Sequence, residues 1–423
     1  MAARTTLQRL LPDAGAPENL DAHIGVFGPR PLLDARTMLD ALDDSGLRGR
    51  GGAAFPTGTK WRAVLQHVDG AGAVVIANAA EREPASDKDR TLLLLRPHLV
   101  LDGLEHAAET LGARRAIVYT SRADDDVRRT LQTAITERRQ RVDTSVFIEV
   151  ATGPNRYVAG EETALIARVS GHLAKPRVVP PRPYASGVGG VPTLVQNAET
   201  LAHAALIARH GASWFRSAGT PRTPGTVLVS VTGAVASPGV SETDATATIG
   251  DIARRAGGVI GEPAAVLIGG YSGRWVPASA IMDTPIDVDA LRSAGASIGA
   301  GVIAILPVNA CGVVETDRVL TYLAAESARQ CGPCHVGLPA LADTLHRVAT
   351  GRARQAALDT LTRWSQDVLG RGACQHPDGA ARFLISALQV FGADLRHHLR
   401  NGACRYSGQP PLLPIPETEE GWW

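Results

Sequence analysis

Residues 46–61 read GLRGRGGAAFPTGTKW and place five glycines and three basic side chains within sixteen positions. Glycine lets the backbone approach a ligand closely, backbone amides in such loops attract anions, and a nearby cation adds a charge-assisted contact. This composition is typical of a loop that binds a phosphate or a dinucleotide. A turn-rich connection with solvated arginines has the same composition, and the GxGxxG fingerprint is missing, so the loop alone leaves both interpretations open.

Short apolar runs follow the glycine loop at regular intervals. Residues 74–77 (VVIA), 116–119 (AIVY) and 146–150 (VFIEV) are typical of buried strands. They alternate with helical patterns, as between residues 99 and 111. This alternation predicts an α/β domain with a mainly parallel sheet covered by helices.

Two polar loops follow strands of this predicted sheet. The loop NAAEREP (78–84) places Asn78, Glu81 and Glu83 where a parallel sheet usually holds its ligand, and these side chains suit a flavin or a ribose. The stretch GPNRYVAGEETAL (153–165) places Glu161 and Glu162 at a predicted helix N-terminus. Capping of a loop or helix explains these carboxylates equally well, because the helix dipole favours them there.

The sequence pattern after residue 175 predicts two further units. The Pro- and Gly-rich residues 175–192 indicate an ordered loop or a boundary, and alternating valines from 227 to 231, a helix near 249–253 and a strand at 265–268 resemble a β-grasp module. Helices are predicted at 317–330, 338–350, 355–369 and 378–400, the last with one apolar face typical of a bundle. The uncharged residues 293–314 contain several glycines and a proline, which predict two buried strands rather than a membrane helix.

The cysteines indicate a metal or cluster site. Cys331 and Cys334 form a C-G-P-C motif, and Cys374 follows 39 intervening residues later. Three soft ligands suit an iron–sulfur cluster, zinc with His335 or His376 as fourth ligand is an alternative, and a redox dithiol is a third. Outside this set, Cys311 is expected to be a buried core thiol, Cys404 a stray tail cysteine or a substitute ligand, and the pair His397 and His398 solvated.

The balance of charges and the N-terminal sequence exclude several classes of protein. The 43 Lys and Arg residues nearly balance the 42 Asp and Glu residues, which leaves no basic field for nucleic acid or an anionic membrane. The first twenty residues lack the apolar run of a secretory signal. We therefore expect a cytoplasmic protein that does not bind nucleic acid.

The order of the motifs resembles a known family. GLRGRGGAAFPTGTKW, NAAEREPASDKDR, YVAGEETAL, GVPTLVQNAET and ESARQCGPCHVG, followed by Cys374, are together similar to the NADH-binding FMN flavoprotein subunit of respiratory complex I. The same subunit type occurs in NAD-reducing hydrogenases and formate dehydrogenases. The resemblance covers roughly residues 30 to 400.

The resemblance implies a fold and a division into domains. The fold is an α/β domain that binds FMN and nucleotide, followed by a ubiquitin-like SLBB β-grasp domain and a C-terminal helical bundle with an iron–sulfur cluster. On this basis the α/β domain spans residues 1–222, the SLBB domain 223–315, the cluster-binding domain 316–405 and a Pro-rich tail 406–423.

The resemblance also implies roles for individual residues. Glu161 and Glu162 would contact the nicotinamide as the catalytic pair, and Phe55 would stack on the adenine. The remaining residues implied to bind the cofactors are Gly49, Arg50, Gly51, Gly52, Lys60, Asn78, Glu81, Tyr157, Gly160 and Asn197. The implied cluster ligands are Cys331, Cys334 and Cys374.

Several positions depart from the family pattern. On the flavin side, an aspartate is replaced by Ala80 and a glycine by Arg82, and two aromatic residues that hold the adenine are replaced by Ala63 and Arg182. Arginine can stack on adenine or bind a 2'-phosphate, so NADPH becomes an alternative to NADH. The first cluster ligand is replaced by Ala328. Three thiolates can hold a 4Fe-4S cluster with one open iron or a 3Fe-4S cluster, unless the cluster has been lost.

The family function is therefore expected in modified form. The chain would be an NAD(P)H oxidoreductase subunit that transfers a hydride from the nicotinamide to FMN and then passes single electrons through an iron–sulfur cluster. Its expected partner is a ferredoxin-like or thioredoxin-like electron-transfer subunit, and such partners would link it to a membrane-associated complex. The alternative is a divergent relay or non-catalytic subunit that has lost NADH oxidation, which the four changes at residues 80, 82, 182 and 328 favour.

Overall fold

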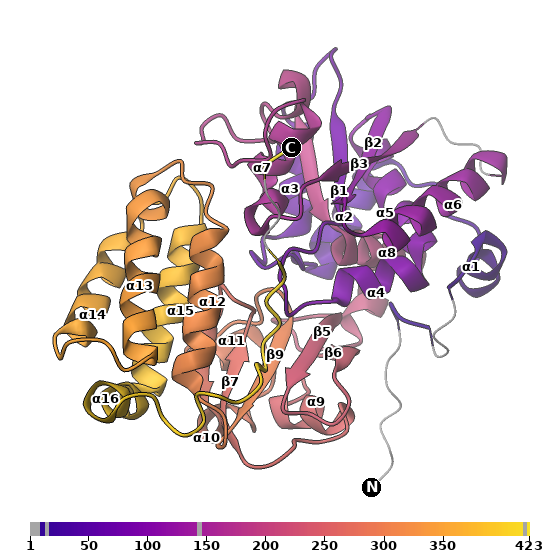
Figure 1. The fold of residues 1–423 in the computed structure, drawn as a ribbon. Coiled ribbons are helices and arrows are strands. Elements are labelled where there is room, and N and C mark those ends of the chain that lie inside the picture. Colours follow the sequence, from indigo (N-terminus) through magenta and orange to yellow (C-terminus); the bar gives the residue numbers. More distant parts are fainter. Residues whose placement is uncertain (1–8, 13–16, 142–145, 418–420) are drawn as a thin grey trace, which may run out of the picture.

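Three units follow one another along the chain in the computed structural model, which describes residues 9–12, 17–141, 146–417 and 421–423 (Figure 1). An α/β unit is followed by a second sheet and then by a group of helices. The expectations for the first twenty residues fall partly on 1–8 and 13–16, outside the described residues. Among the described residues, no helix combines the length and the apolar character that crossing a membrane requires.

The first sheet is fully parallel, as the sequence predicts. Its strands are β1 (Val74–Asn78), β2 (Arg115–Ser121), β3 (Phe147–Gly153) and β4 (Thr193–Asn197), in the order β3-β2-β1-β4. Strand β1 pairs in parallel with β2 on one side and β4 on the other. Helices cover both faces of such a sheet, which explains why β1 is an uninterrupted apolar run from Val74 to Ala77.

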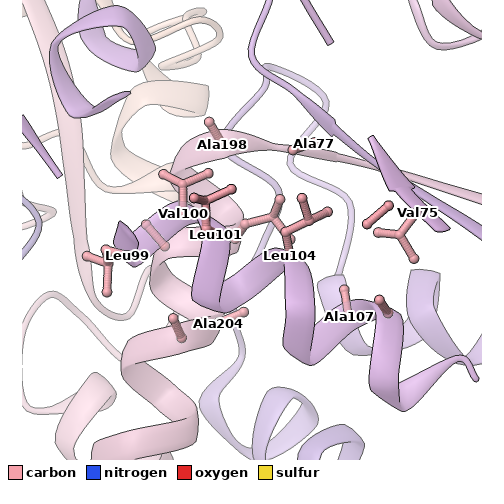
Figure 2. Close-up of a cluster of buried hydrophobic side chains, with 14 of the residues drawn as sticks. Val75, Ala77, Leu99, Val100, Leu101, Leu104, Ala107, Ala198 and Ala204 are labelled. Carbon is pink, nitrogen blue, oxygen red and sulfur yellow. The ribbon is translucent and has the colours of Figure 1, made fainter. Parts of the chain in front are cut away.

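Helices pack closely around this sheet. They are α1 (Leu20–Phe27), α2 (Ala35–Ser45), α3 (Thr57–Leu65), α4 (Lys88–Leu95), α5 (Pro97–Thr110), α6 (Asp125–Arg141), α7 (Glu162–Val169) and α8 (Ala198–Arg216), with short 3-10 turns η1 (Tyr157–Gly160) and η2 (Val188–Gly190). Figure 2 shows Leu101 and Leu104 of α5 in the core that α5 shares with β1 and α8. Gly103 lets the two helices touch, because a Cβ there would lie 1.9 Å from the carbonyl oxygen of Leu201.

The second sheet is mixed. Its strands are β5 (Thr226–Gly233), β6 (Gly239–Asp244), β7 (Pro263–Ile268), β8 (Arg274–Pro277) and β9 (Val302–Pro307), in the order β6-β5-β9-β7-β8, with helices α9 (Ile249–Arg255), α10 (Ala278–Ile281) and α11 (Val288–Ser293). Strands β5 and β9 are parallel, and the other neighbours are antiparallel. The prediction of two strands within residues 293–314 is wrong. Only β9 forms, because glycines 295, 299 and 301 adopt positive φ angles before it and a helix begins at Gly312 after it.

The C-terminal unit is helical, as predicted. It contains α12 (Gly312–Ala325), the π-helical turn η3 (Pro333–Gly337), α13 (Leu338–Ala349), α14 (Ala357–Val368), α15 (His376–Val390) and α16 (Gly392–Asn401). The single helix predicted over 378–400 is in fact two helices that meet at Phe391. The Phe391 ring lies directly against Gly312, where a Cβ would come within 2.3 Å of it, and Gly392 weakens the helix at the junction.

The last segment runs back across the molecule to the α/β unit (Figure 1). The backbone nitrogens of Leu412 and Leu413 donate hydrogen bonds to Glu315 at 3.1 Å, and Tyr271 donates one to the carbonyl oxygen of Pro414. Beyond the gap at residues 418–420, the nitrogen of Ala174 donates to the carbonyl oxygen of Trp422 at 2.7 Å. The C-terminal segment therefore contacts all three units.

Candidate functional site

Asn78 and Asn197 lie side by side at the carboxyl edge of the parallel sheet. They end β1 and β4 and are partners in the strand register. The Asn78 amide donates a hydrogen bond to the carbonyl oxygen of Gly160 at 2.9 Å. The Asn197 oxygen caps helix α8 by accepting from Thr200 N at 3.3 Å. The carboxyl edge of such a sheet is where open α/β folds bind their ligands.

The glycine loop lies against this edge. A Cβ on Gly51 would be 3.2 Å from the Cβ of Asn197, so a larger residue there would push the loop away from β4. Gly51 and Gly52 are exposed, and the Phe55 side chain is 52% exposed. Arg50, which we expected at the cofactor, lines a cavity with Gly49 and Gly52. It also donates hydrogen bonds to the carbonyl oxygens of Pro224 at 3.2 Å and Thr226 at 3.0 Å, at the start of the second sheet.

The two adjacent glutamates have different partners. Glu162, the first residue of α7, forms an ion pair of 2.8 Å with Lys60, whose ammonium also donates to the carbonyl oxygen of Val195 at 2.7 Å. Glu161 is the N-cap of α7 and accepts from the nitrogens of Thr163 at 2.9 Å and Ala164 at 3.1 Å. Burial raises the pKa of Glu161. Of the expected catalytic pair, the structure therefore engages Glu161 in capping and places Glu162 beside Lys60.

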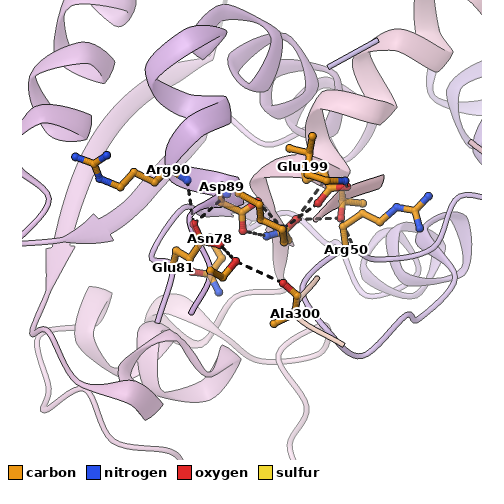
Figure 3. A network of polar contacts seen from close by, with 12 residues as sticks. Arg50, Asn78, Glu81, Asp89, Arg90, Glu199 and Ala300 are labelled. Atoms are coloured by element: carbon orange, nitrogen blue, oxygen red, sulfur yellow. Dashed lines mark hydrogen bonds and ion pairs between the residues drawn. The ribbon is translucent and has the colours of Figure 1, made fainter. Parts of the chain in front are cut away.

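A buried polar network supports the sheet edge (Figure 3). Glu81 accepts hydrogen bonds from the backbone nitrogens of Asp89 at 3.0 Å and Arg90 at 3.1 Å, in the first turn of α4. Burial raises the pKa of Glu81 to about 8. Lys88 lies 2.8 Å from Asp89 and 2.9 Å from Glu199, and these carboxylates raise its pKa although burial alone would lower it.

Sequence reasoning missed this charged cluster. Asp89 accepts a hydrogen bond from the Asn197 amide at 2.6 Å, so the cluster orients a residue that was expected to hold FMN. Lys88 and Asp89 stand in the quoted motif NAAEREPASDKDR, but a charged run on a helix usually faces solvent. Only the tertiary pairing with Glu199 of α8 shows that these charges are buried.

A polar cavity of about 160 Å³ lies next to the carboxyl end of β1, with Glu81, Arg82, Glu83 and Tyr157 in its wall. Glu83 accepts hydrogen bonds from the Tyr271 nitrogen at 2.8 Å and the Tyr157 hydroxyl at 3.2 Å. Burial raises the pKa of Glu83 to about 7. Groups that titrate near neutral pH in a cleft are typical of functional sites.

Arg82 fills space beside the expected flavin residues. A Cβ on Gly160 would lie 2.9 Å from the Arg82 Cγ, and the Arg82 guanidinium donates to the side-chain oxygen of Asn155 at 2.7 Å. The arginine therefore packs along the backbone of Gly160. Arg182, the second substituted arginine, is exposed.

The residues at the sheet edge fit FMN. A flavin nucleotide presents carbonyl and phosphate oxygens, which need donors and a close backbone approach. Lys60 and the amides of Asn78 and Asn197 each hold bonds within the protein and keep one further N–H that could donate to a ligand. The exposed backbone of Gly51 and Gly52 allows the close approach, whereas Arg82 occupies the space beside Gly160. These residues would hold FMN, with Arg82 narrowing the pocket.

The three expected cluster cysteines lie near enough for Cys331 to influence both Cys334 and Cys374, but they are not a group whose ligand atoms all lie within 4.8 Å of one another. Cys331 precedes the turn η3, Cys334 lies within it, and Cys374 precedes α15. Burial raises the pKa of Cys334 to about 12 and that of Cys374 to about 11, and the Cys331 thiol raises both further. A bound metal cluster would lower these pKa values, because it binds the thiolate form. Each cysteine of such a cluster binds a different iron atom, so the sulfur atoms need not lie close to one common point.

Ala328 itself cannot be a ligand, but the hydroxyl of the neighbouring Ser327 hydrogen-bonds to the Cys334 thiol. Ala328 is buried and lines a cavity of about 260 Å³ together with Arg156 and Trp422, so this position offers space. His376 is buried with its Nε2 at 2.9 Å from the carbonyl oxygen of Leu323, and His335 is exposed. The Nε2 of His376 is thus bound to backbone, while its buried Nδ1 has no hydrogen-bond partner among the described residues.

The cluster motif contacts the cofactor loop directly. The Tyr157 nitrogen donates to the carboxylate of Glu326 at 2.6 Å, and the Tyr157 ring lies 5.6 Å from the His376 ring. Glu161 is close enough to Cys374 for its charge to raise the pKa of that thiol, although burial is the larger cause. The chain segments expected to bind the flavin and the cluster are therefore adjacent.

One residue departs from the sequence expectations at another point of the helical unit. His398 is fully buried, so the prediction that it is solvated is wrong. The cause is its position on the inner side of α16, with Nδ1 at 2.9 Å from the carbonyl oxygen of Ala349. Cys404 lies beside His398 and Cys311, and the three side chains together could bind a metal ion.

Comparison with known proteins identifies two matching families of domains. Residues 42–205 match the family model described as the Nuo51 FMN-binding domain, and residues 315–398 match the model of the NADH-ubiquinone oxidoreductase-F iron-sulfur binding region. The F-type subunit of the NADH-quinone oxidoreductase of Mycobacterium tuberculosis is 33% identical over 404 residues, 91% of each chain. The F-type subunit numbered 2 of Rhizobium meliloti is 31% identical over 94% of this chain and 97% of its own.

A solved structure shows the same fold. An NAD+-reducing [NiFe]-hydrogenase in the H2-reduced state superposes with a TM-score of 0.78 at 32% identity over 88% of this chain. The match spans 63% of the hydrogenase chain. Together with the two family models and the identity to the curated relatives, it shows that this chain belongs to the family of NADH-quinone oxidoreductase F-type subunits.

Proposed function

We propose that this chain oxidises NADH or NADPH with bound FMN and delivers the electrons to an iron–sulfur cluster. FMN supplies the chemistry that accepts a hydride and releases single electrons. Family membership and the two matched domains, FMN-binding and iron–sulfur-binding, support the proposal. The observation that carries it is the contact between Tyr157 and Glu326, which places the cofactor loop against the cluster motif.

The chain's residues would divide the work as follows. Lys60, Asn78, Asn197 and the glycine loop would hold the FMN, and Glu162 would contact the nicotinamide from beside Lys60. Phe55 is exposed and available to stack on adenine. Glu81 and Glu161 would support the site by capping α4 and α7. Cys331, Cys334 and Cys374 would bind the cluster.

We also propose the domain division at residues 1–222, 223–315, 316–405 and 406–423. The second unit would be an SLBB β-grasp domain. Its mixed sheet with hairpin β5–β6, helix α9 and a central β9 parallel to β5 supports this assignment. The relatives are named as subunits, and we propose that this chain likewise passes electrons to a ferredoxin-like or thioredoxin-like partner subunit.

Steady-state assays test the function and its donor. The purified chain, with FMN and reconstituted cluster, should reduce ferricyanide when NADH or NADPH is added. In Arg82→Gly, which restores the glycine of the family pattern, the ratio of kcat/KM for NADPH over NADH should fall. The absence of activity with either nucleotide in a chain that holds both cofactors would favour the alternative of a relay subunit without nucleotide oxidation.

A further inference from the structure

Three ligating side chains meet outside the sites described above. One potential ligand atom each from Cys311, His398 and Cys404 lies within 4.8 Å of the other two. The Cys311 sulfur is 3.4 Å from the Nε2 of His398. Cys311 and His398 are buried and Cys404 is half-buried, so solvent reaches the group from one side.

Three separate pieces of backbone build this group. Cys311 is the N-cap residue of α12, and His398 lies in the last turn of α16. Gly402 ends α16 with a positive φ of 82°, which turns the chain so that the Cys404 nitrogen comes 3.4 Å from the His398 Nε2. This turn after α16 thus brings Cys404 back over the histidine.

The backbone partner of His398 determines which of its ring nitrogens donates a hydrogen bond. Its Nδ1 lies 2.9 Å from the carbonyl oxygen of Ala349, which can only accept a hydrogen bond. Nδ1 therefore carries a hydrogen, and Nε2 accepts from the Cys404 nitrogen and lies 3.4 Å from the Cys311 sulfur. A histidine that donates its other ring N–H to a carbonyl is the usual arrangement of a metal-binding imidazole.

The separation of the Cys311 sulfur from the His398 Nε2 suits a zinc ion. With Zn–S of about 2.3 Å and Zn–N of about 2.05 Å, a tetrahedral site separates sulfur and nitrogen by about 3.6 Å. The observed separation of 3.4 Å between Cys311 and His398 is close to this value. The N-terminus of α12 also favours the negative charge of a thiolate at Cys311.

We propose that Cys311, His398 and Cys404 form a zinc site separate from the iron–sulfur cysteines, with water as the fourth ligand. The ion would join the start of α12 to the end of α16 and to the segment that follows. That segment continues to Pro416, which lines the cavity containing Arg82 and Tyr157. Zinc would therefore fix the base of the segment that closes this cavity.

Alkylation of Cys404 tests the proposal in the unaltered chain. The reduced, chelator-treated protein is exposed to iodoacetamide with and without zinc, and mass spectrometry follows each cysteine. Zinc should slow the modification of Cys404 about ten-fold or more, because the sulfur becomes a ligand. Modification of Cys404 that zinc leaves unchanged, or a disulfide between Cys311 and Cys404 in place of metal binding, would overturn the proposal.

Variants separate this site from the cluster. In a chain with Cys331, Cys334 and Cys374 all changed to serine, cobalt titration should still give thiolate charge-transfer bands at one ion per chain. Adding His398→Gln should weaken this binding about ten-fold or more. Equal binding with and without His398→Gln would reject the site. Circular dichroism of each variant checks that it is folded.

Discussion

The Nε atom of Arg156 lies 3.2 Å from the carboxylate of Glu326, and both side chains are buried. The same carboxylate accepts a hydrogen bond from the Tyr157 nitrogen at 2.6 Å. Arg156 belongs to the loop before α7, and Glu326 caps the end of α12 next to the cluster motif. A single buried carboxylate therefore holds the cofactor loop in position against the cluster.

Glu326→Gln should weaken the junction between the two redox sites. Removing one partner of a buried ion pair costs about 3 kcal/mol because the other charge remains buried. We expect a lower thermal midpoint and slower cluster reduction, while reduction of the flavin by nucleotide changes little. Stopped-flow absorbance separates the two steps. The matched control is Asp343→Asn, which removes an exposed pair with Arg347 on α13 and should change neither quantity.

Glu162→Gln should slow the reduction of the flavin by nucleotide. The change removes the charge that faces Lys60 at 2.8 Å, and a hydrogen bond to a charged group is worth about 1.5–3 kcal/mol, or roughly ten-fold or more in rate. The FMN content should stay similar, because Asn78 and Asn197 remain. Glu149→Gln, which removes an exposed pair with Arg115, serves as control. Unchanged reduction kinetics in Glu162→Gln would remove this residue from the site.

Cys334→Ala should abolish the cluster and leave the flavin. The buried thiol at position 334 is one of only three cysteines near η3 and α15 in the described chain, so its loss leaves two. Iron and sulfide analysis should show loss of both, with FMN retained. Cys404→Ala is the control and should keep the iron, because Cys404 lies with His398. Iron at the wild-type ratio in Cys334→Ala would reject the cluster assignment.

Glu83 should make stability depend on pH. Its pKa rises from 4.5 to about 7 in the folded chain, so the folded state holds this proton more tightly than the unfolded state. Its contribution to the free energy of unfolding therefore falls as pH rises from about 4.5 to about 7, by up to about 3 kcal/mol.

Glu83→Gln imitates the protonated acid. The thermal midpoint of this variant should therefore rise relative to that of the wild type as the pH increases over this range. Comparing the two proteins cancels the opposite effect of His376, whose pKa burial lowers to about 4. A difference between the two midpoints that stays constant from pH 5 to pH 8 would show that Glu83 does not titrate as described.

The sequence predicts the fold where a pattern is regular. The apolar runs at 74–77, 116–119 and 146–150 become β1, β2 and β3 because a parallel sheet needs strands buried on both faces. The break between α15 and α16 escapes prediction, since the apolar spacing continues through Phe391. It depends on the contact of that ring with Gly312, 79 positions away in the chain.

The site is predictable to a smaller degree. The order of the motifs identifies Lys60, Asn78, Glu162 and Asn197 as candidate site residues. The structure places them around one edge of the sheet. The partners of Arg50 and the burial of Lys88 depend on contacts between distant segments, which no local pattern encodes. The group around His398 is missed for the same reason, because its three ligands come from separate pieces of chain.

An anaerobic titration of the purified, cluster-reconstituted chain tests the central claim most directly. FMN and iron are quantified first, and the visible spectrum is then followed as NADH and, in a second sample, NADPH is added. We predict that at least one nucleotide bleaches the flavin band and that the cluster absorbance falls with it. A chain that binds no FMN, or whose bound FMN neither nucleotide reduces, would contradict the account.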